Sequence, residues 1–329
     1  MVSIKDVAKH AGVAISTVSK VLNNYPNVSE ETKQRVNRAV EELNFVPNSV
    51  AAALSSKQAG RVALLVNVNM KTSAVDEINM QHITGALNRA MELSLDAITL
   101  FSFMYQNMTV DELIRYLKSQ SITGIIIYGM SKEDKVLHKL VAAQEFKCVV
   151  VNAPLVNEST SSVGIDDRKA QYDVARKTIE ENRCKRVLYI AGKRNGYVTD
   201  ERLLGMEQLA SELGLTMLVR NGEFSELQAR NITMKYAKNK DVVVCASDLM
   251  AIGAMKALIE MDIFRPVCGF DGIVLMGYVG KQMNTVCQNF AEVSRNAMEE
   301  LHALLGGAQG RKLVLPHSLA RMKYEDIIC

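Results

Sequence analysis

The stretch between Val13 and Asn23 carries side chains whose types and spacing suit contact with nucleic acid. Apolar residues recur there at helical spacing and form a stripe for burial: Ala14, Val18, Val21 and Leu22. The opposite face of the same helix presents Ile15, Ser16, Ser19 and Lys20. Such side chains offer hydrogen bonds to phosphates and base edges, and methyl contacts to thymine. Taken alone, this short pattern also fits an ordinary helical hairpin.

The neighbouring residues predict two further helices that would hold this face in position. Upstream, Ser3 and Asp6 have the spacing of a capping box, and Gly12 suits the left-handed turn that ends a helix. The helix between them has a stripe of Ile4, Val7, Ala8 and Ala11. A third helix begins at Ser29, with acidic residues in its first turn and a stripe of Val36, Ala39, Val40 and Leu43. These elements predict an all-α helix-turn-helix head.

Three motifs in this opening, Ser3–Ala8, Thr17–Asn23 and Asn44–Asn48, give the chain a family resemblance. The chain resembles the lactose-repressor (LacI/GalR) family of bacterial transcription regulators, specifically over its first 57 residues and more loosely over the rest. The resemblance implies a cytoplasmic homodimer that binds a palindromic DNA operator and whose affinity is set by a small molecule. It implies no enzymatic activity and no cofactor.

We expect the exposed face of the second helix to read the operator in the major groove. Ile15 is expected to meet a thymine methyl group, Ser16 a base edge and Lys20 a guanine. Three more polar residues are expected to hold phosphates and so fix the register: Thr17, Ser19 and Asn23.

The segment 46–58 is predicted to be a hinge between the head and the body. Its alanine-rich part is only about two turns long and is marginal as an isolated helix. The resemblance implies that it pairs with the same helix of a second subunit in the minor groove, where Leu54 would act as an apolar wedge. A simple linker with one surface leucine is the alternative. Ala52 and Ser55 stand where the family often has arginine and lysine, which weakens the electrostatic attraction to the groove.

The composition is that of a globular protein with about two domains and a large core. The chain has 329 residues, of which 48% are hydrophobic and 23% charged. We expect a cytoplasmic protein, because no apolar run approaches a membrane span and charged residues interrupt the N-terminus. A net charge of +3 is too small to indicate DNA binding by itself. The six cysteines form no Cys-x-x-Cys pair and predict free thiols without a metal.

From Arg61 onward, apolar runs rich in β-branched residues alternate with helical stretches, which predicts an α/β body. Two such series indicate two parallel-sheet lobes, similar to those of periplasmic sugar-binding proteins. We therefore expect a head at 1–45, a hinge at 46–58 and a body at 59–329. The first lobe is predicted to span about 59–162 and 288–317, and the second about 163–287 and 318–329.

Ligands of open parallel sheets bind beyond the carboxyl ends of the strands, so polar residues there are the candidate effector contacts. They are Asn67, Asn69, Asn152, Arg202, Ser247, Asp271 and Gln288. The resemblance makes Arg202 and Asp271 the strongest of these and adds Phe224 as an aromatic that packs on a ring. A guanidinium and a carboxylate suit a vicinal diol or a purine edge.

Each of these assignments has a structural alternative. Asp248 and Asp271 are also plausible helix N-caps, and Arg202 is also compatible with a surface helix. The adjacent pair Asp166 and Asp167 fits a helix N-terminus better than a pair of catalytic acids.

Two functions from different classes compete at this point. The first is the ligand-responsive repressor, with a sugar-like or related metabolite as effector. The second is a cytosolic sugar-binding protein or a sugar-acting enzyme with a vestigial head. The chain contains no Gly-x-Ser-x-Gly, His-Glu-x-x-His, P-loop or Gly-x-Gly-x-x-Gly motif, which disfavours an enzyme.

Overall fold

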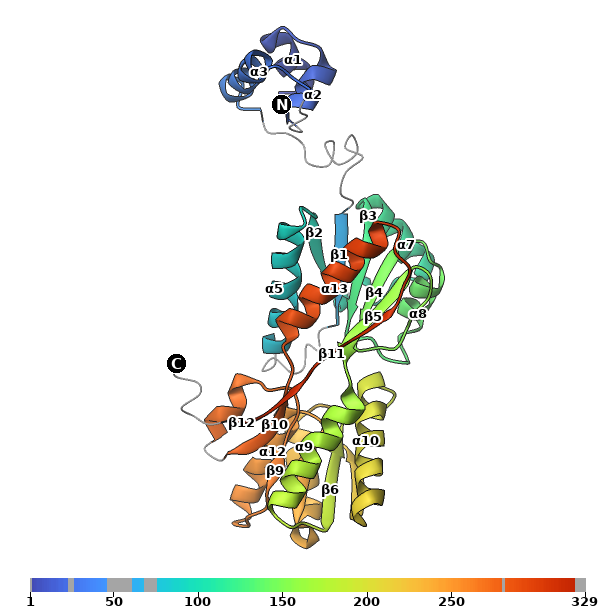
Figure 1. Cartoon of the computed structure of the whole chain (residues 1–329), viewed down its shortest axis with the longest axis vertical. Coiled ribbons are helices and arrows are strands. Elements are labelled where there is room, and N and C mark those ends of the chain that lie inside the picture. Colours follow the sequence, from blue (N-terminus) through green and yellow to red (C-terminus); the bar gives the residue numbers. More distant parts are fainter. Residues whose placement is uncertain (1, 23–26, 46–60, 68–75, 280–281, 323–329) are drawn as a thin grey trace. The chain divides into compact units, whose positions relative to one another are not determined.

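The computed structural model describes residues 2–22, 27–45, 61–67, 76–279 and 282–322. Contacts within the chain divide it into two units, residues 1–60 and residues 61–329. Figure 1 shows the helical head and the two lobes of the body. Asn23, Leu54 and Asn69 lie outside the described residues, as does the predicted hinge.

The head consists of α1 (Ile4–Ala11), α2 (Ile15–Leu22) and α3 (Glu30–Glu42). The Asp6 carboxylate accepts hydrogen bonds from the Ser3 backbone N–H (2.8 Å) and hydroxyl (2.7 Å), which confirms the predicted capping pair. Gly12 ends α1 with a φ of 64°, a conformation that a side chain would disfavour. The three apolar stripes meet in one small core: Val7, Ala8, Ala11, Val18, Val21, Val36 and Ala39. The prediction for Ala14 is wrong, because this residue precedes α2 and is exposed.

The first lobe is a six-stranded, fully parallel sheet with helices on both faces, in the order β11-β5-β4-β3-β1-β2. Its strands are β1 (Arg61–Val66), β2 (Ala97–Phe101), β3 (Ile122–Tyr128), β4 (Lys147–Val151), β5 (Thr160–Ile165) and β11 (Lys312–Leu315). Its helices are α5 (Asp76–Glu92), α6 (Ser102–Tyr105), α7 (Val110–Ser119), α8 (Lys135–Ala142) and α13 (Phe290–Leu305). Separate apolar clusters lie under α5 with α13 and under α7 with α8.

The second lobe has the strand order β12-β10-β9-β8-β6-β7, with β12 antiparallel at the edge. Its strands are β6 (Arg186–Ala191), β7 (Thr216–Asn221), β8 (Val242–Cys245), β9 (Val267–Cys268), β10 (Met283–Cys287) and β12 (Ser318–Met322). Its helices are α9 (Asp167–Glu181), α10 (Tyr197–Leu213), α11 (Glu226–Tyr236), α12 (Asp248–Glu260) and the 3₁₀ turns η1 (Ala237–Asn239) and η2 (Val274–Val279).

The chain crosses between the lobes three times: after β5, after β10 and between β11 and β12 (Figure 1). The predicted boundary at residue 163 is wrong, because β5 pairs with β4 through Val163 and belongs to the first lobe. The strand is buried throughout and lies between β4 and β11 in the first sheet, so the chain crosses to the second lobe only at Asp166. The prediction of two parallel sheets also needs correction at β12, which pairs antiparallel with β10. The chain enters β12 directly from β11 of the first lobe, so β12 runs away from that lobe while β10 runs toward it.

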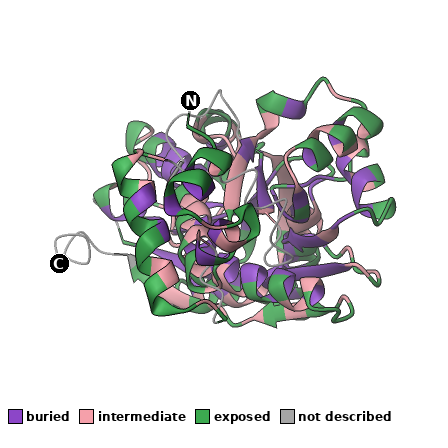
Figure 2. Ribbon diagram, turned by 90° about the horizontal axis from the view of Figure 1, so that it is seen from above, coloured by how far each residue is buried: buried purple, intermediate pink, exposed green. Residues whose placement is uncertain are grey.

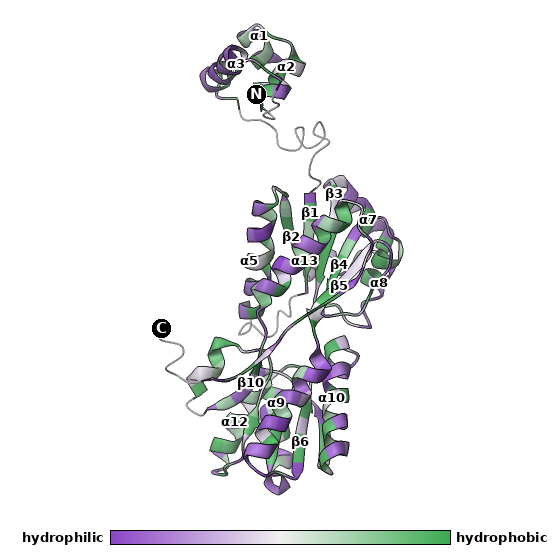
Figure 3. Ribbon diagram, viewed as in Figure 1, coloured by the Kyte–Doolittle hydropathy of each residue, from purple (hydrophilic) through white to green (hydrophobic). Residues whose placement is uncertain are grey.

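Burial follows the alternation of strands and helices seen in the sequence. Buried residues concentrate on the strands and on the inner sides of the helices, as Figure 2 shows. Figure 3 shows the corresponding hydropathy: the central strands are apolar and the outer sides of the helices are polar. Apolar runs without alternation are expected for parallel strands that are covered on both faces. In the part of the chain that the structure describes, no helix is long and apolar enough to span a membrane.

Candidate functional site

The α2 helix of the head presents the predicted reading face to solvent. Ile15 is 44% exposed although it is a large apolar residue, and Ser16 and Lys20 are also exposed. Thr17 and Ser19 are half-buried beside them. Val18 and Val21 anchor the opposite side of α2 in the head core. Burial of one stripe therefore determines which side chains are available to a DNA groove.

A second group of polar residues meets at the carboxyl ends of the strands in the second lobe, around Arg202. The side chain of Arg202 is 4% exposed, so the alternative of a surface helix residue is wrong. Its Nε donates to Asp167 Oδ1 at 2.8 Å and its Nη1 to the Ala246 carbonyl at 2.6 Å. Its guanidinium also lies 3.6 Å from the centre of the Phe270 ring. These contacts fix the guanidinium rigidly at the end of β8.

Asp271 lies beside this arginine and is held by Gln288. Gln288 Nε2 donates to Asp271 Oδ1 at 3.1 Å, and Arg202 Nη1 is 3.8 Å from the same oxygen. The φ of Asp271 is 130°, a backbone conformation rare for residues other than glycine. Such strain is typical of ligand sites, where the surroundings hold the residue in place. The predicted pair of Arg202 and Asp271, with Gln288, is thus brought together.

Asp248 holds the backbone that carries Asp271. Its Oδ2 accepts hydrogen bonds from the Gly272 N–H at 2.7 Å and the Ile273 N–H at 2.9 Å. Its Oδ1 accepts from the Thr285 hydroxyl at 2.6 Å. Asp248 has a structural role, but the prediction that it is a helix N-cap is wrong: Ser247 is the N-cap of α12, with its Oγ accepting from Met250 N at 3.3 Å. Ser247 was predicted as an effector contact, and its hydroxyl is engaged in this cap.

The remaining predicted contacts are divided between the two lobes. Phe224 is half-buried at the end of β7, where it approaches Gly192 so closely that a Cβ there would lie 2.1 Å from its ring. In the first lobe, Asn67 Nδ2 donates to the Gly129 carbonyl at 3.1 Å. Asn152 has a φ of 58°, and its buried Oδ1 has no hydrogen-bond partner. An unsatisfied buried acceptor is costly unless a ligand supplies a donor.

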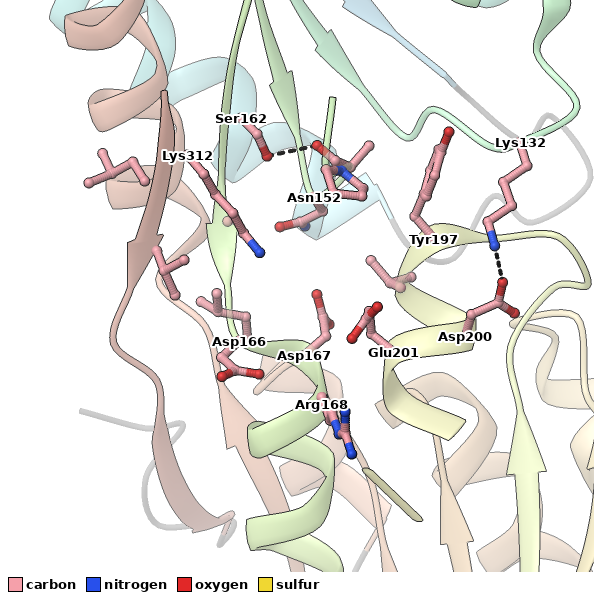
Figure 4. Close-up of a pocket in the computed structure, with 17 residues that line it drawn as sticks. Lys132, Asn152, Ser162, Asp166, Asp167, Arg168, Tyr197, Asp200, Glu201 and Lys312 are labelled. Carbon is pink, nitrogen blue, oxygen red and sulfur yellow. Dashed lines mark hydrogen bonds and ion pairs between the residues drawn. The ribbon is translucent and has the colours of Figure 1, made fainter. Parts of the chain in front are cut away.

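A cleft of about 460 Å³ opens between the lobes, and among the predicted effector contacts that the structure describes only Asn152 lines it. Figure 4 shows Asn152 above it and Asp167, Glu201 and Lys312 pointing into it. Lys132 of the first lobe pairs with Asp200 of α10 and bridges the lobes at one end of the cleft. Asp167 links the cleft to Arg202, because it lines one and binds the other. The volume suits a small metabolite.

Sequence reasoning missed Asp167 as a site residue. Asp166 is the N-cap of α9, as the pair predicted, and accepts from Lys169 N at 2.9 Å. Asp167 instead points inward to Arg202 and is 8% exposed. Thr199 and Phe270 were missed as well, and only the position of Phe270 next to Asp271 offered a signal.

Burial raises the pKa of Asp271 to about 8; the positive charge of Arg202 lowers this pKa, and the carboxylates of Asp248 and Asp167 raise it. We expect the free energy of unfolding to fall as the pH rises from about 4 to about 8, because the unfolded chain releases this proton first. The Asp271→Asn variant should lose this dependence. Urea unfolding between pH 5 and pH 8 would measure it, with the exposed Asp262→Asn as control. Parallel curves for the wild type and Asp271→Asn would contradict the prediction.

Comparison with known proteins decides the family. Residues 3–48 match the family model for bacterial regulatory proteins of the lacI family, and residues 73–273 match that for periplasmic binding proteins and the sugar binding domain of the LacI family. The chain belongs to the LacI family.

Relatives of this LacI-family chain are transcription regulators and not enzymes. The HTH-type transcriptional regulator MalR of Clostridium butyricum is 28% identical, with 92% of each chain covered. Catabolite control protein A of Staphylococcus aureus is 26% identical, with 97% of each covered. The fold matches the lac repressor dimer bound to operator and the anti-inducer ONPF, with a TM-score of 0.82, 23% identity and 98% of each chain covered. It also matches the CelR–cellobiose complex, with a TM-score of 0.70, 24% identity and coverage of 98% and 100%.

Proposed function

We propose that this LacI-family regulator is a homodimeric repressor that binds a palindromic operator and releases or holds it according to a small effector in the interlobe cleft. The observation that carries the proposal is the pairing of two sites in one chain. An exposed reading face on α2 stands in the head, and a buried polar cluster with an adjoining cleft stands in the body.

Several further observations support this reading. The cleft lies between two lobes that three chain crossings connect, and residues of both lobes line it. A ligand bound there would therefore contact both lobes. A ligand with different affinities for two lobe arrangements shifts their populations, and the effect on DNA affinity is reciprocal. The lac repressor is bound to operator and anti-inducer in the solved structure that matches this fold. The cytoplasm is the proposed location.

Operator selection with the purified chain tests the proposal directly. We expect enrichment of a palindrome with two half-sites, bound by two protomers, because two-fold symmetry in the protein imposes it on the DNA. Affinity should fall steeply with salt, as phosphate contacts require. The alternative of a sugar-binding protein with a vestigial head predicts no enriched sequence, and that result would refute the proposed repressor.

Replacing Lys20 with alanine is expected to weaken binding to the selected operator by about 1–3 kcal/mol and to relax specificity at one base pair. The physical reason is the loss of a donor on the exposed face of α2. Fluorescence anisotropy with the selected site and single-base variants would measure both effects. Lys33→Ala is a matched control, because Lys33 pairs with Glu30 on α3. Equal losses of operator affinity for the two variants would show that Lys20 does not contact a base.

A further inference from the structure

Arg35 of α3 donates hydrogen bonds to the turn that joins α1 to α2. Its Nη2 lies 2.7 Å from the carbonyl oxygen of Ala11 and 3.2 Å from that of Gly12. Gly12 is also packed against this nitrogen, because a Cβ at that position would lie 3.2 Å from it. A side chain of the third helix therefore holds the turn that leads into the second.

The two carbonyl groups that Arg35 binds lie at the end of α1, where a helix leaves acceptors without partners of its own. The Gly12 N–H bonds to the carbonyls of Ala8 and Lys9, so backbone groups satisfy the earlier part of this helix end. The Ala11 and Gly12 carbonyls follow, and the guanidinium supplies their donor. Its positive charge also complements the negative end of the α1 dipole. The contact is therefore a helix cap supplied from a distant part of the chain.

The other basic side chains of α3 are engaged within their own helix. Lys33 pairs with Glu30 at 2.6 Å, and Arg38 pairs with Glu42 at 2.9 Å. Arg38 is 80% exposed, and exposed pairs contribute little because water screens them. Arg35 differs from both in that its hydrogen bonds reach another element. Arg38 therefore offers a matched comparison, with the same charge three residues further along α3.

The start of α2 is the end of that helix that the turn controls. Val18 and Val21 lie further along α2 and are anchored in the head core. Ile15 and Ser16, in the first turn of α2, are exposed and lack such an anchor. Their positions therefore depend on the direction in which the chain leaves the turn that Arg35 holds.

We propose that Arg35 is a positioning residue for DNA reading, which sets the places of Ile15 and Ser16 against the bases by fixing the turn before α2. The inference goes beyond the proposed function and rests on its reading of an operator by α2. Contacts to base edges depend on direction, since hydrogen bonds weaken steeply when they are misaligned. The attraction to phosphates is independent of sequence and depends mainly on charge.

Three roles of Arg35 give different results in DNA binding. A residue that only stabilises the head changes the folded fraction, which scales the affinity for every DNA by the same factor. A residue that contacts a phosphate changes all affinities nearly uniformly and lowers the salt slope by about one unit when it is removed. A positioning residue instead changes the ratio of affinities between the operator and other sequences.

Fluorescence anisotropy with the full chain measures that ratio for the selected operator and a scrambled duplex of equal length. We expect Arg35→Ala to lower the ratio about 10-fold, which is of the order of one mismatched base pair. Arg35→Met keeps the apolar stem and removes only the donors, so it should lower the ratio as much even if the alanine variant fails to fold. Arg38→Ala removes the same charge from α3 and should leave the ratio unchanged.

Double-mutant cycles locate the effect along α2. With Arg35→Met as background, Ile15→Ala should reduce operator affinity by a smaller factor than it does in the wild type, because the contact is already misplaced. Lys20→Ala should reduce it by the same factor in both backgrounds, since Val18 and Val21 anchor that part of α2.

An unchanged ratio in Arg35→Met would overturn the proposal, whether the affinities fall uniformly or not at all. Full additivity between Arg35→Met and Ile15→Ala would overturn it as well. Both results leave the repressor standing, because the wild type still selects an operator. A wild-type chain that selects no operator refutes the proposed repressor before any variant is made.

Discussion

Replacing Arg202 with alanine is expected to lower the free energy of unfolding of the body by about 3–5 kcal/mol. The change removes the guanidinium that binds Asp167 and the Ala246 carbonyl and that covers Phe270. It leaves the carboxylates of Asp167 and Asp271 buried without a cation, which is the costly result of breaking a buried ion pair. The chain has no tryptophan, so urea unfolding is best followed by circular dichroism.

Arg186→Ala is the matched control for this prediction. Arg186 also pairs with an aspartate of the second lobe, Asp241, at 2.7 Å, but its side chain is 55% exposed. Exposed pairs contribute little because water screens them. A loss at Arg202 no larger than that at Arg186 would show that the cluster tolerates buried carboxylates without a cation and would contradict the prediction.

Asp248→Ala is expected to destabilise the body by about 3 kcal/mol or more, because three donors, two buried and one half-buried, lose their acceptor at once. They are the N–H groups of Gly272 and Ile273 and the hydroxyl of Thr285. The same change releases the backbone that holds Asp271 at its unusual φ, so effector binding should weaken as well. Chemical unfolding measures the first effect, and calorimetry with a compound that stabilises the wild type measures the second.

Asp248→Asn distinguishes geometry from charge at this position. The asparagine oxygen is able to accept from both backbone N–H groups, while its NH₂ group donates to the Thr285 hydroxyl. We therefore expect the variant to retain most of the stability that alanine loses. Burial raises the pKa of Asp248 to about 6, so the advantage of asparagine over aspartate should grow as the pH rises from about 4 to about 6 and stay constant above that. Equal destabilisation by both substitutions would show that the negative charge itself holds this loop.

The three helices of the head, and the alternation of strands and helices along the body, were predictable from local sequence patterns. Short-range rules act within a few residues: the Ser3–Asp6 cap, the left-handed Gly12 and the stripe that buries Val18 and Val21 while exposing Ile15 and Lys20. Buried parallel strands likewise appear as apolar runs, whatever their partners are. These features determine the family and the elements on which candidate contacts lie.

Only the tertiary structure shows which polar side chains are engaged with other parts of the protein, in ion pairs or helix caps, and which face the cleft. The sequence places Asp166 and Asp167 side by side, yet one caps α9 and the other is buried against Arg202, 35 residues away in the chain. For the same reason, Ser247 caps α12 although it was predicted as an effector contact, and Asp248 holds the backbone at Gly272 although it was predicted as the cap. The observed boundary between the lobes lies after the predicted one, because Val163 pairs with β4 of the first lobe. Burial and long-range hydrogen bonds depend on the packing of distant elements, and no local pattern contains that information.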